Sequence, residues 1–278
     1  MGKDQTIRGA GRLRRYGLPG RFLSDRIIDR NLAHRRESVM MLHVGRVGST
    51  VLGRMLDRHS HVAWPGEIFY RTPARHTSER RTPSEIRQLI RERAGQSAAD
   101  VFGFEVKHAP TQDLSPAVTN LDFPTLLSLF RDFGGRKIIH LRRRNIVRRC
   151  VSAELARGRR TYHVKEQAGE LPRIELPLRD QVFGYGRFDL IDVLDRCDAR
   201  TPERVEGFDL LSLVYEDDIE RDPGVAFTKI CDFLGLPEED CVPDLKKIDP
   251  RPIQEIFVNF DEVERYLEKT PYHQHLFE

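Results

Sequence analysis

The sequence predicts a single α/β domain in which a mostly parallel sheet carries helices on both faces. Short, nearly continuous apolar runs have the length of buried strands, and they lie at residues 39–44, 137–141 and 210–215. Segments with the apolar spacing of amphipathic helices follow each run. Strands that alternate with helices in this way usually pair in parallel and become covered on both sides.

The first unit, residues 39–56, changes periodicity twice. Its strand ends at Gly45, the loop GRVGST spans residues 45–50, and apolar residues then recur on one helical face. Two glycines allow a sharp turn and a close approach to a ligand. The helix start and the guanidinium of Arg46 favour a bound phosphate or sulfate. The fold is therefore P-loop-like, although the Lys of the nucleotide-triphosphate motif is missing. Tight packing between strand and helix is the alternative interpretation of this stretch.

The next segments continue the alternation. Residues 61–69 (HVAWPGEIF) form a short strand or loop, and TPSE at 82–85 is a capping box with a first-turn proline that begins a helix. Residues 101–108 (VFGFEVKH) alternate like a strand that ends in Lys107 and His108. Open α/β sheets place their ligands at such strand ends.

A second junction of strand and helix begins at residue 137. The strand KIIHL leads into RRRNIVRRCVSAELARG, whose apolar residues define an amphipathic helix. Arg144, Arg148 and Ser152 recur every four residues, so two guanidiniums and a hydroxyl lie along one flank. Together with the first loop, this junction implies two anion sites, as a nucleotide with phosphates at both ends of its ribose requires.

The rest of the chain adds helices and polar loops. Further helices are predicted over residues 22–33, 123–133, 178–196, 223–234 and 261–268. The polar segments 71–81 and 158–177 are predicted to be an exposed loop and a long loop or lid, and we expect acceptor specificity to reside in them. Residues 1–37, rich in Arg and Gly, are expected to form a basic N-terminal arm, and residues 38–278 one α/β domain with a C-terminal extension.

Composition narrows the class of protein. The chain has 278 residues, 39% of them hydrophobic and 32% charged, with a net charge of +3. Arginines are clustered locally, which favours separate anion sites over a nucleic-acid surface. No apolar run approaches the roughly 18 residues that span a bilayer, so we expect a cytoplasmic protein without a transmembrane segment. The four cysteines are widely spaced and no metal-ligand cluster is evident, so neither a disulfide framework nor a metal is predicted.

Three motifs in order resemble the sulfotransferases that use 3′-phosphoadenosine-5′-phosphosulfate (PAPS). GRVGST resembles their 5′-phosphosulfate loop, with Val47 in place of a small residue. Arg144 followed eight residues later by Ser152 resembles their 3′-phosphate motif. The segment LVYEDDIERDPGVAFTKICDFLGLP resembles their conserved stretch ending in FLGLP. The resemblance covers roughly residues 39–240 and is closest to bacterial carbohydrate and glycolipid enzymes of the nodulation-factor type.

The resemblance implies roles for the residues that match these motifs. The loop residues Arg46, Val47, Gly48, Ser49 and Thr50 would hold the 5′-phosphosulfate. Arg144 and Ser152 would hold the 3′-phosphate, and Arg251 would close over the nucleotide. PAPS is then the sulfuryl donor, no metal is needed, and the partner is a small-molecule or glycan hydroxyl acceptor.

Transfer to a hydroxyl needs a general base, and two residues are candidates. Glu67, in PGEIF, resembles the catalytic Glu of the carbohydrate branch and is our first choice. His108, in VKHAP, resembles the base of the small-molecule branch, although the register differs by one residue. Lys107 is a candidate for binding the sulfuryl group. The alternatives are a loop carboxylate paired with an arginine for Glu67, a histidine bonded to the backbone for His108, and a solvated strand end for Lys107. We expect Glu216 and Asp217 to fix the loop arginines or to cap the next helix.

Two other functions remain open at this point. The first is a P-loop kinase that acts on a small molecule, which the missing Lys of the triphosphate loop disfavours. The second is a non-catalytic protein that binds a nucleotide or a sulfated ligand. Neither the acceptor nor the oligomeric state follows from the sequence.

Overall fold

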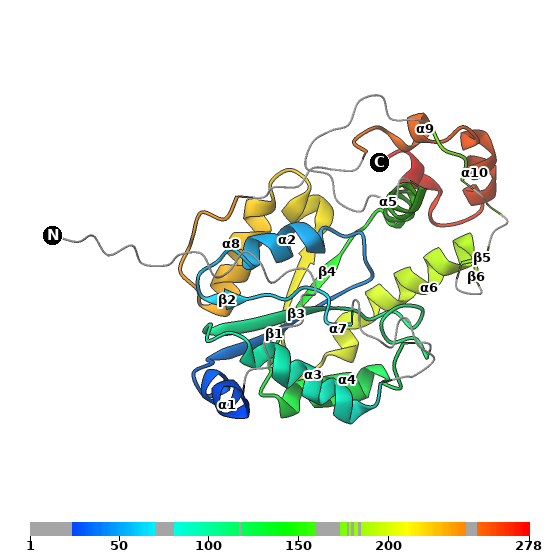
Figure 1. The fold of residues 1–278 in the computed structure, drawn as a ribbon. Coiled ribbons are helices and arrows are strands. Elements are labelled where there is room, and N and C mark those ends of the chain that lie inside the picture. Colours follow the sequence, from blue (N-terminus) through cyan, green and yellow to red (C-terminus); the bar gives the residue numbers. More distant parts are fainter. Residues whose placement is uncertain are drawn as a thin grey trace.

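The fold is built on one parallel sheet, shown in Figure 1. The computed structural model describes residues 24–69, 81–116, 118–158, 173–176, 178, 181–182, 185–242 and 249–278. The sheet has five strands in the order β2-β3-β1-β4-β7, and each strand pairs in parallel with its neighbours. They are β1 (Glu37–His43), β2 (Val62–Ala63), β3 (Val101–Lys107), β4 (Lys137–Arg142) and β7 (Asp209–Val214). The predicted α/β class with a mostly parallel sheet is confirmed.

Helices cover both faces of the sheet. The pair α2 (Ser49–Leu56) and α8 (Pro223–Leu234) lies on one face, and α3 (Pro83–Gly95) and α4 (Phe123–Asp132) lie on the other (Figure 1). Successive side chains of a strand point to opposite faces of the sheet. Because β1 is apolar at successive positions, both faces of the sheet need to be covered. Val39 and Met41 belong to the core under α2 and α8, whereas Met40 and Leu42 belong to the core over α3 and α4.

The local signals for helix ends operate as predicted. Thr82 and Glu85 form a reciprocal capping box at the start of α3, and Asp222 caps α8 through the amide of Gly224. Helix α8 ends at Gly235 in the left-handed conformation, with φ of 66°. The helix predicted over 22–33 is α1 (Asp25–Ala33), and it packs against α3.

The C-terminal segment forms a third core with the helix that follows β4. That helix is α5 (Ile146–Gly158), and α9 (Ile253–Ile256), α10 (Phe260–Leu267) and the 3-10 helix η3 (His273–Leu276) gather beside it (Figure 1). Helix α6 (Arg187–Ala199), the short α7 (Thr201–Arg204) and the π-helical turn η2 (Tyr215–Ile219) complete the elements at this end. The C-terminal extension is therefore packed on α5, close to the carboxyl ends of the strands.

One predicted helix begins in the wrong place. The segment 178–196 was expected to be helical throughout, but α6 starts only at Arg187 and continues to Ala199. Before it lies a small antiparallel pair, β5 (Gln181–Val182) and β6 (Tyr185–Gly186). The sequence has glycines at 184 and 186, and each costs a helix about 1 kcal/mol relative to Ala. Gly186, in an extended conformation, precedes the first helical residue.

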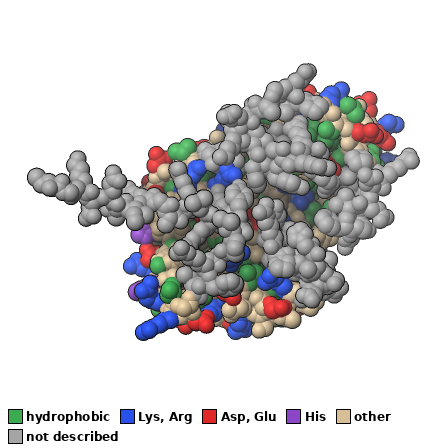
Figure 2. Space-filling view, viewed as in Figure 1, with side chains coloured by type: hydrophobic (Ala, Val, Ile, Leu, Met, Phe, Trp, Pro, Cys, Tyr) green, Lys and Arg blue, Asp and Glu red, His purple; other side chains and the backbone are tan. Residues whose placement is uncertain are grey.

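Several expectations concern residues that lie outside the described part of the chain. These are residues 1–23, most of the loop predicted at 71–81 and most of the segment 158–177. Within the described ranges, none of the helices has both the length and the hydrophobicity to cross a bilayer. Acidic and basic side chains both occur on the described surface visible in Figure 2, as a net charge of +3 leads one to expect.

Candidate functional site

The sheet order places the candidate site. Strand β1 lies between β3 and β4, although β2 follows it in the sequence. The chain therefore leaves β1 toward one side of the sheet and later returns to its other side, which makes a topological switch point. Ligands of open α/β sheets bind at the carboxyl ends of the strands there. Most of the sequence-predicted site residues lie in the segments that follow β1, β3 and β4; Lys107 is the last residue of β3, and Glu67 and Arg251 lie elsewhere in the chain.

The loop after β1, residues 45–50, will be called the anion loop. Three of its residues have positive φ, namely Gly45 at 79°, Arg46 at 60° and Gly48 at 91°. Arg46 is the one non-glycine with positive φ among the described residues, and such a conformation is stored strain. Val47 is fully buried in the core beneath α2. Its bulk therefore lies inside the protein, so it does not obstruct the ligand side of the loop.

Arg46 connects the two predicted anion sites. Its Nε and Nη2 atoms donate to Ser152 Oγ on α5, at 3.2 and 3.0 Å. Arg143, which follows β4, donates from Nη1 to the carbonyl of Arg46 at 3.4 Å. Ser49 and Thr50 form the first turn of α2, where helix amides lack intrahelical acceptors. The two junctions that the sequence singles out thus belong to one site.

Arg149 holds the anion loop from beneath, and the sequence did not indicate this role. Its side chain is buried, and it donates from Nε to the Gly45 carbonyl at 2.9 Å and from Nη2 to the Val44 carbonyl at 2.6 Å. The sequence did contain one signal for this role: Arg149 lies three residues after the apolar Ile146, so the two residues share a face of the helix. An arginine on a buried face needs acceptors, and here they are the carbonyls of the loop.

The Arg149→Met variant is expected to loosen the anion loop. The Gly45 carbonyl would lose its buried donor, whereas the Val44 carbonyl keeps one from Gln112 Nε2 at 2.8 Å. An unsatisfied buried carbonyl costs about 1–3 kcal/mol, so the free energy of unfolding measured with urea should fall by about that amount. Affinity for nucleotide should fall as well. Arg87→Met, which removes an exposed pair with Asp132, is the control, and an equal effect of both variants would contradict the assignment.

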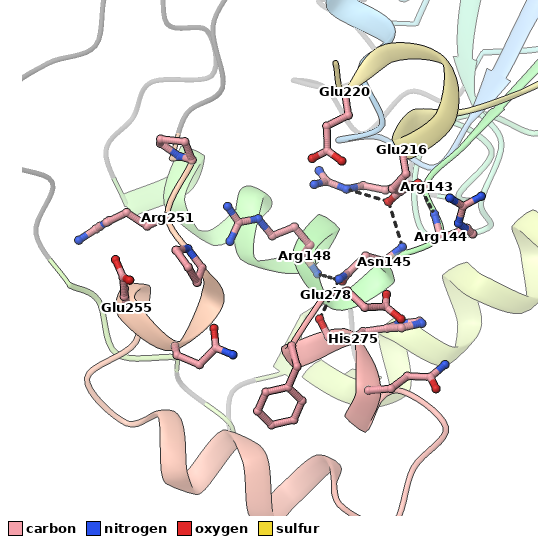
Figure 3. A pocket seen from close by; sticks show the side chains of 15 residues that line it. Arg143, Arg144, Asn145, Arg148, Glu216, Glu220, Arg251, Glu255, His275 and Glu278 are labelled. Atoms are coloured by element: carbon pink, nitrogen blue, oxygen red, sulfur yellow. Dashed lines mark hydrogen bonds and ion pairs between the residues drawn. The ribbon is translucent and has the colours of Figure 1, made fainter. Parts of the chain in front are cut away.

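A cavity of about 1020 Å³ opens beside this junction (Figure 3). Arg143, Arg144, Arg148 and Arg251 line it together with Glu216, Glu220 and Glu255. The guanidinium of Arg143 stacks on the ring of Tyr215, 4.2 Å from its centroid. Burial lowers the pKa values of Arg143 and Arg148 below the usual range of arginine. Desolvated cations of this kind favour an anionic ligand.

Arg144 and Ser152 are not brought face to face. Arg144 forms a bidentate pair with Asp217, at 2.5 and 2.7 Å, and its side chain is 52% exposed. Eight residues along a helix correspond to roughly 12 Å, so Arg144 lies at the cavity rim whereas Ser152 lies at Arg46. The carboxylate of Glu216 accepts from the amides of Arg144 and Asn145 at the start of α5. Asp217 therefore fixes an arginine as predicted, whereas Glu216 caps α5 and the next helix, α8, is capped by Asp222.

Arg251 reaches the same cavity from the C-terminal segment. It binds Asp249 through Nε and Nη2, at 3.0 and 2.8 Å, and Arg148 donates to the Asp249 carbonyl at 2.8 Å. Figure 3 shows Arg251 across the cavity from Arg143, with Arg148 extending between them. The predicted position of Arg251 over the nucleotide site is compatible with this arrangement.

Glu67 and Lys107 form a pair at the end of β3. Lys107 Nζ lies 2.6 Å from Glu67 Oε1, and both side chains are mostly buried. Glu67 forms an isolated parallel bridge with Glu105 of β3, which brings it to this edge of the sheet. The Lys107 stem passes within 3.5 Å of the position that a Cβ on Gly45 would occupy. Lys107 therefore lies between the carboxylate of Glu67 and the anion loop.

His108 points to the other side of the sheet. Its Nε2 is 2.8 Å from Thr201 Oγ1 and its Nδ1 is 3.2 Å from the His43 carbonyl. Burial, followed by the neighbouring His140, lowers the pKa of His108 to about 3. The residue lines a separate cavity of about 920 Å³ near the start of α4. Successive residues of a strand face opposite ways, which explains why Lys107 and His108 diverge.

A family match covers most of the chain. A family model described as Stf0 sulphotransferase matches residues 38–250. Among solved structures, the sulfotransferase domain of the Synechococcus PCC 7002 olefin synthase is similar, with 18% identity, coverage of 78% of this chain and 86% of that chain, and a TM-score of 0.40. At that score the likeness carries no argument. No curated protein matches the chain.

The family match contains the anion loop, the pair of Glu67 and Lys107, and the junction of β4 with α5. It spans well over half of the sequence. The chain belongs to the Stf0 sulphotransferase family.

Proposed function

We propose that this sulfotransferase moves the sulfuryl group of PAPS to a hydroxyl of a carbohydrate or glycolipid. The observation that carries the proposal is the contact of Arg46 with Ser152, which joins the loop after β1 to the helix after β4. A nucleotide phosphorylated at both the 3′ and the 5′ position suits two linked anion sites better than a triphosphate does, since a triphosphate concentrates its charge on one loop.

The residues present fit such a donor. Positive φ at Gly45, Arg46 and Gly48 is a backbone conformation found in anion-binding loops. Arg143 and Arg148 are partly desolvated cations beside it, and a bound phosphate would offset the cost of keeping them charged. In this proposal Arg46, Gly48, Ser49 and Thr50 bind the phosphosulfate, while the 3′-phosphate lies between Ser152 and Arg144 under Arg251, which requires the Arg144 guanidinium to turn from Asp217 toward the phosphate.

Glu67 is assigned as the general base. As the acceptor oxygen attacks sulfur, a new S–O bond forms and the hydroxyl proton passes to the Glu67 carboxylate. The bond between sulfur and the 5′-phosphate oxygen breaks, and its electron pair stays on that oxygen. Arg46 then stabilises the charge that develops on the leaving phosphate. Lys107, at 2.6 Å, holds the carboxylate in orientation.

The geometry favours Glu67 over His108 for this role. Both ring nitrogens of His108 face groups of the protein, since Nδ1 is 3.2 Å from the His43 carbonyl and Nε2 is 2.8 Å from Thr201 Oγ1, and burial lowers the pKa of His108 to about 3. Its ring is also almost fully buried. Glu67 is partly accessible and pairs with Lys107 next to the anion loop.

The acceptor class rests on the likeness of the Glu67 context and of the tail VNFDEVERYLEKTPY to enzymes of the nodulation-factor type. Most of the two loops expected to shape the acceptor pocket lies outside the described residues. A screen of glycan and lipid hydroxyls with labelled PAPS tests this part. Transfer to phenols or steroids but to no glycan would contradict it.

Calorimetry with 3′,5′-adenosine bisphosphate tests the donor. We expect binding, and we expect Arg144→Ala to weaken it by about 10- to 100-fold, since a charge-assisted hydrogen bond contributes about 1.5–3 kcal/mol. The affinity for 5′-AMP, which lacks the 3′-phosphate, should hardly change in the variant. Equal wild-type affinity for the two nucleotides would contradict the two-site arrangement. Magnesium-dependent turnover of ATP would identify a kinase instead, and tight binding without transfer to any acceptor would identify a binding protein.

A further inference from the structure

A buried acid lies beneath α2 and takes no part in the mechanism above. Glu105, in the middle of β3, is only 4% exposed. Trp64 donates from Nε1 to Glu105 Oε1 at 2.9 Å, and Glu105 Oε2 is 3.4 Å from His43 Nε2. His43, the last residue of β1, is fully buried. A buried pair of this kind is rarely kept for stability alone, because apolar residues of similar size often serve as well.

The backbone of Glu105 holds the proposed base from both sides. Its amide donates to the Gly66 carbonyl at 2.9 Å, and its carbonyl accepts from the Ile68 amide at 3.1 Å. These two bonds fix the residues that flank Glu67. The position of the Glu67 carboxylate therefore depends on where β3 places Glu105.

His43, the other member of the buried pair, contacts the anion loop. The Gly45 amide donates to His43 Nδ1 at 3.0 Å. Nδ1 must then carry no proton, so in the neutral ring the proton is on Nε2, which faces Glu105. The bond from the Gly45 amide thus fixes the tautomer, and the Glu105 carboxylate, 3.4 Å from Nε2 and outside hydrogen-bond geometry, is the nearby negative charge that this tautomer faces.

Helix α2, which follows the anion loop, has a glycine where it packs against Glu105. A Cβ on Gly53 of α2 would lie 2.5 Å from Glu105 Oε1 and 2.9 Å from Trp64 Nε1. Such distances are too short for any side chain larger than hydrogen, so Gly53 permits the close approach of α2 to the acid.

We propose that His43 and Glu105 are positioning residues that fix the anion loop relative to Glu67. The inference rests on the proposed function for its catalytic meaning. His43 orients the first peptide of the loop through Nδ1, the Glu105 carboxylate lies against Nε2 of His43, and the backbone of Glu105 fixes the residues that flank Glu67. One buried pair thereby ties the group that binds the donor to the group that activates the acceptor.

Two substitutions of His43 separate positioning from packing. In His43→Asn the amide oxygen lies near the place of Nδ1 and can accept from Gly45. In His43→Gln the amide extends toward the place of Nε2 and leaves Gly45 without that acceptor. We expect His43→Asn to keep the affinity for 3′,5′-adenosine bisphosphate within about threefold of wild type, whereas His43→Gln should lose about tenfold or more, since one net hydrogen bond is near 1.4 kcal/mol, or tenfold.

The matched control is His140→Gln. His140 is a buried histidine on the adjacent strand, and its Nε2 is 2.9 Å from Asp198 Oδ1. Its substitution should change the melting temperature without a matching loss of nucleotide affinity. If His43→Asn and His43→Gln lost affinity equally, or if His140→Gln lost as much as His43→Gln, the role of His43 would be packing and the proposal would be overturned.

Nuclear magnetic resonance tests the hydrogen bond from the Gly45 amide to His43 Nδ1 independently of the reaction. In the wild-type protein the ¹⁵N shifts of His43 should show Nδ1 unprotonated and Nε2 protonated, and the Gly45 amide should be protected from exchange. That protection should persist in His43→Asn and disappear in His43→Gln. A protonated Nδ1, or a Gly45 amide that exchanges freely in wild type, would overturn the proposal even if PAPS is the donor. A wild-type protein that does not bind the nucleotide would instead refute the proposed function.

Discussion

The Glu67→Gln variant is expected to lose sulfuryl transfer by a factor of about 10²–10⁴, the usual contribution of a general base. Glutamine keeps the size of the side chain and an oxygen that can accept from Lys107 Nζ, now 2.6 Å from the carboxylate. It cannot take up the proton of the acceptor hydroxyl. Initial rates with labelled PAPS measure the loss of transfer, and calorimetry with 3′,5′-adenosine bisphosphate measures nucleotide affinity separately.

Binding of the nucleotide should be nearly unchanged in this variant, because Glu67 acts on the acceptor. Glu92→Gln, on the exposed face of α3, is the control for a change of one surface charge. A Glu67→Gln enzyme with wild-type turnover would exclude Glu67 as the base. If His108→Ala then abolished transfer, the base would be His108 despite its burial.

The sequence was sufficient to predict the parallel sheet. Apolar runs at 39–44, 137–141 and 210–215 correspond to β1, β4 and β7, because strands buried on both faces leave an unambiguous local pattern. Glycines with positive φ in the anion loop were likewise predictable, since no other residue tolerates that backbone easily. The three motifs in order pointed to sulfotransferases, and the family match confirms that assignment.

What the sequence could not provide were contacts between distant residues. Arg149 is 104 residues from Gly45, and His43 is 62 residues from Glu105, so no local spacing relates either pair. The sequence also did not reveal which way the side chains at the end of β3 point. Lys107 and His108 were both candidates at a strand end, and only the pairing of β3 with its neighbours shows that Lys107 faces Glu67 while His108 faces Thr201. The start of α6 was misplaced because the small β5–β6 pair is specified by glycines within an otherwise helical pattern.

The Arg46→Gly variant is expected to lower kcat/KM by about 10²–10³, the usual cost of removing one donor that stabilises developing charge. Glycine is the informative substitution because Arg46 has φ of 60°, a conformation that glycine adopts freely. The variant therefore removes the guanidinium without straining the loop. The two hydrogen bonds to Ser152 are lost together with it.

The comparison with Ser152→Ala shows which function of Arg46 is affected. That variant keeps the guanidinium and removes only its acceptor on α5, so it should weaken nucleotide binding more than it slows transfer. If Arg46 acts on the leaving phosphate, Arg46→Gly must lower kcat by more than it lowers the affinity for 3′,5′-adenosine bisphosphate, which has no sulfuryl group to transfer. Equal losses in both quantities would mean that Arg46 only binds the donor. The charge that develops on the phosphate would then have to be stabilised by the loop amides and by Lys107.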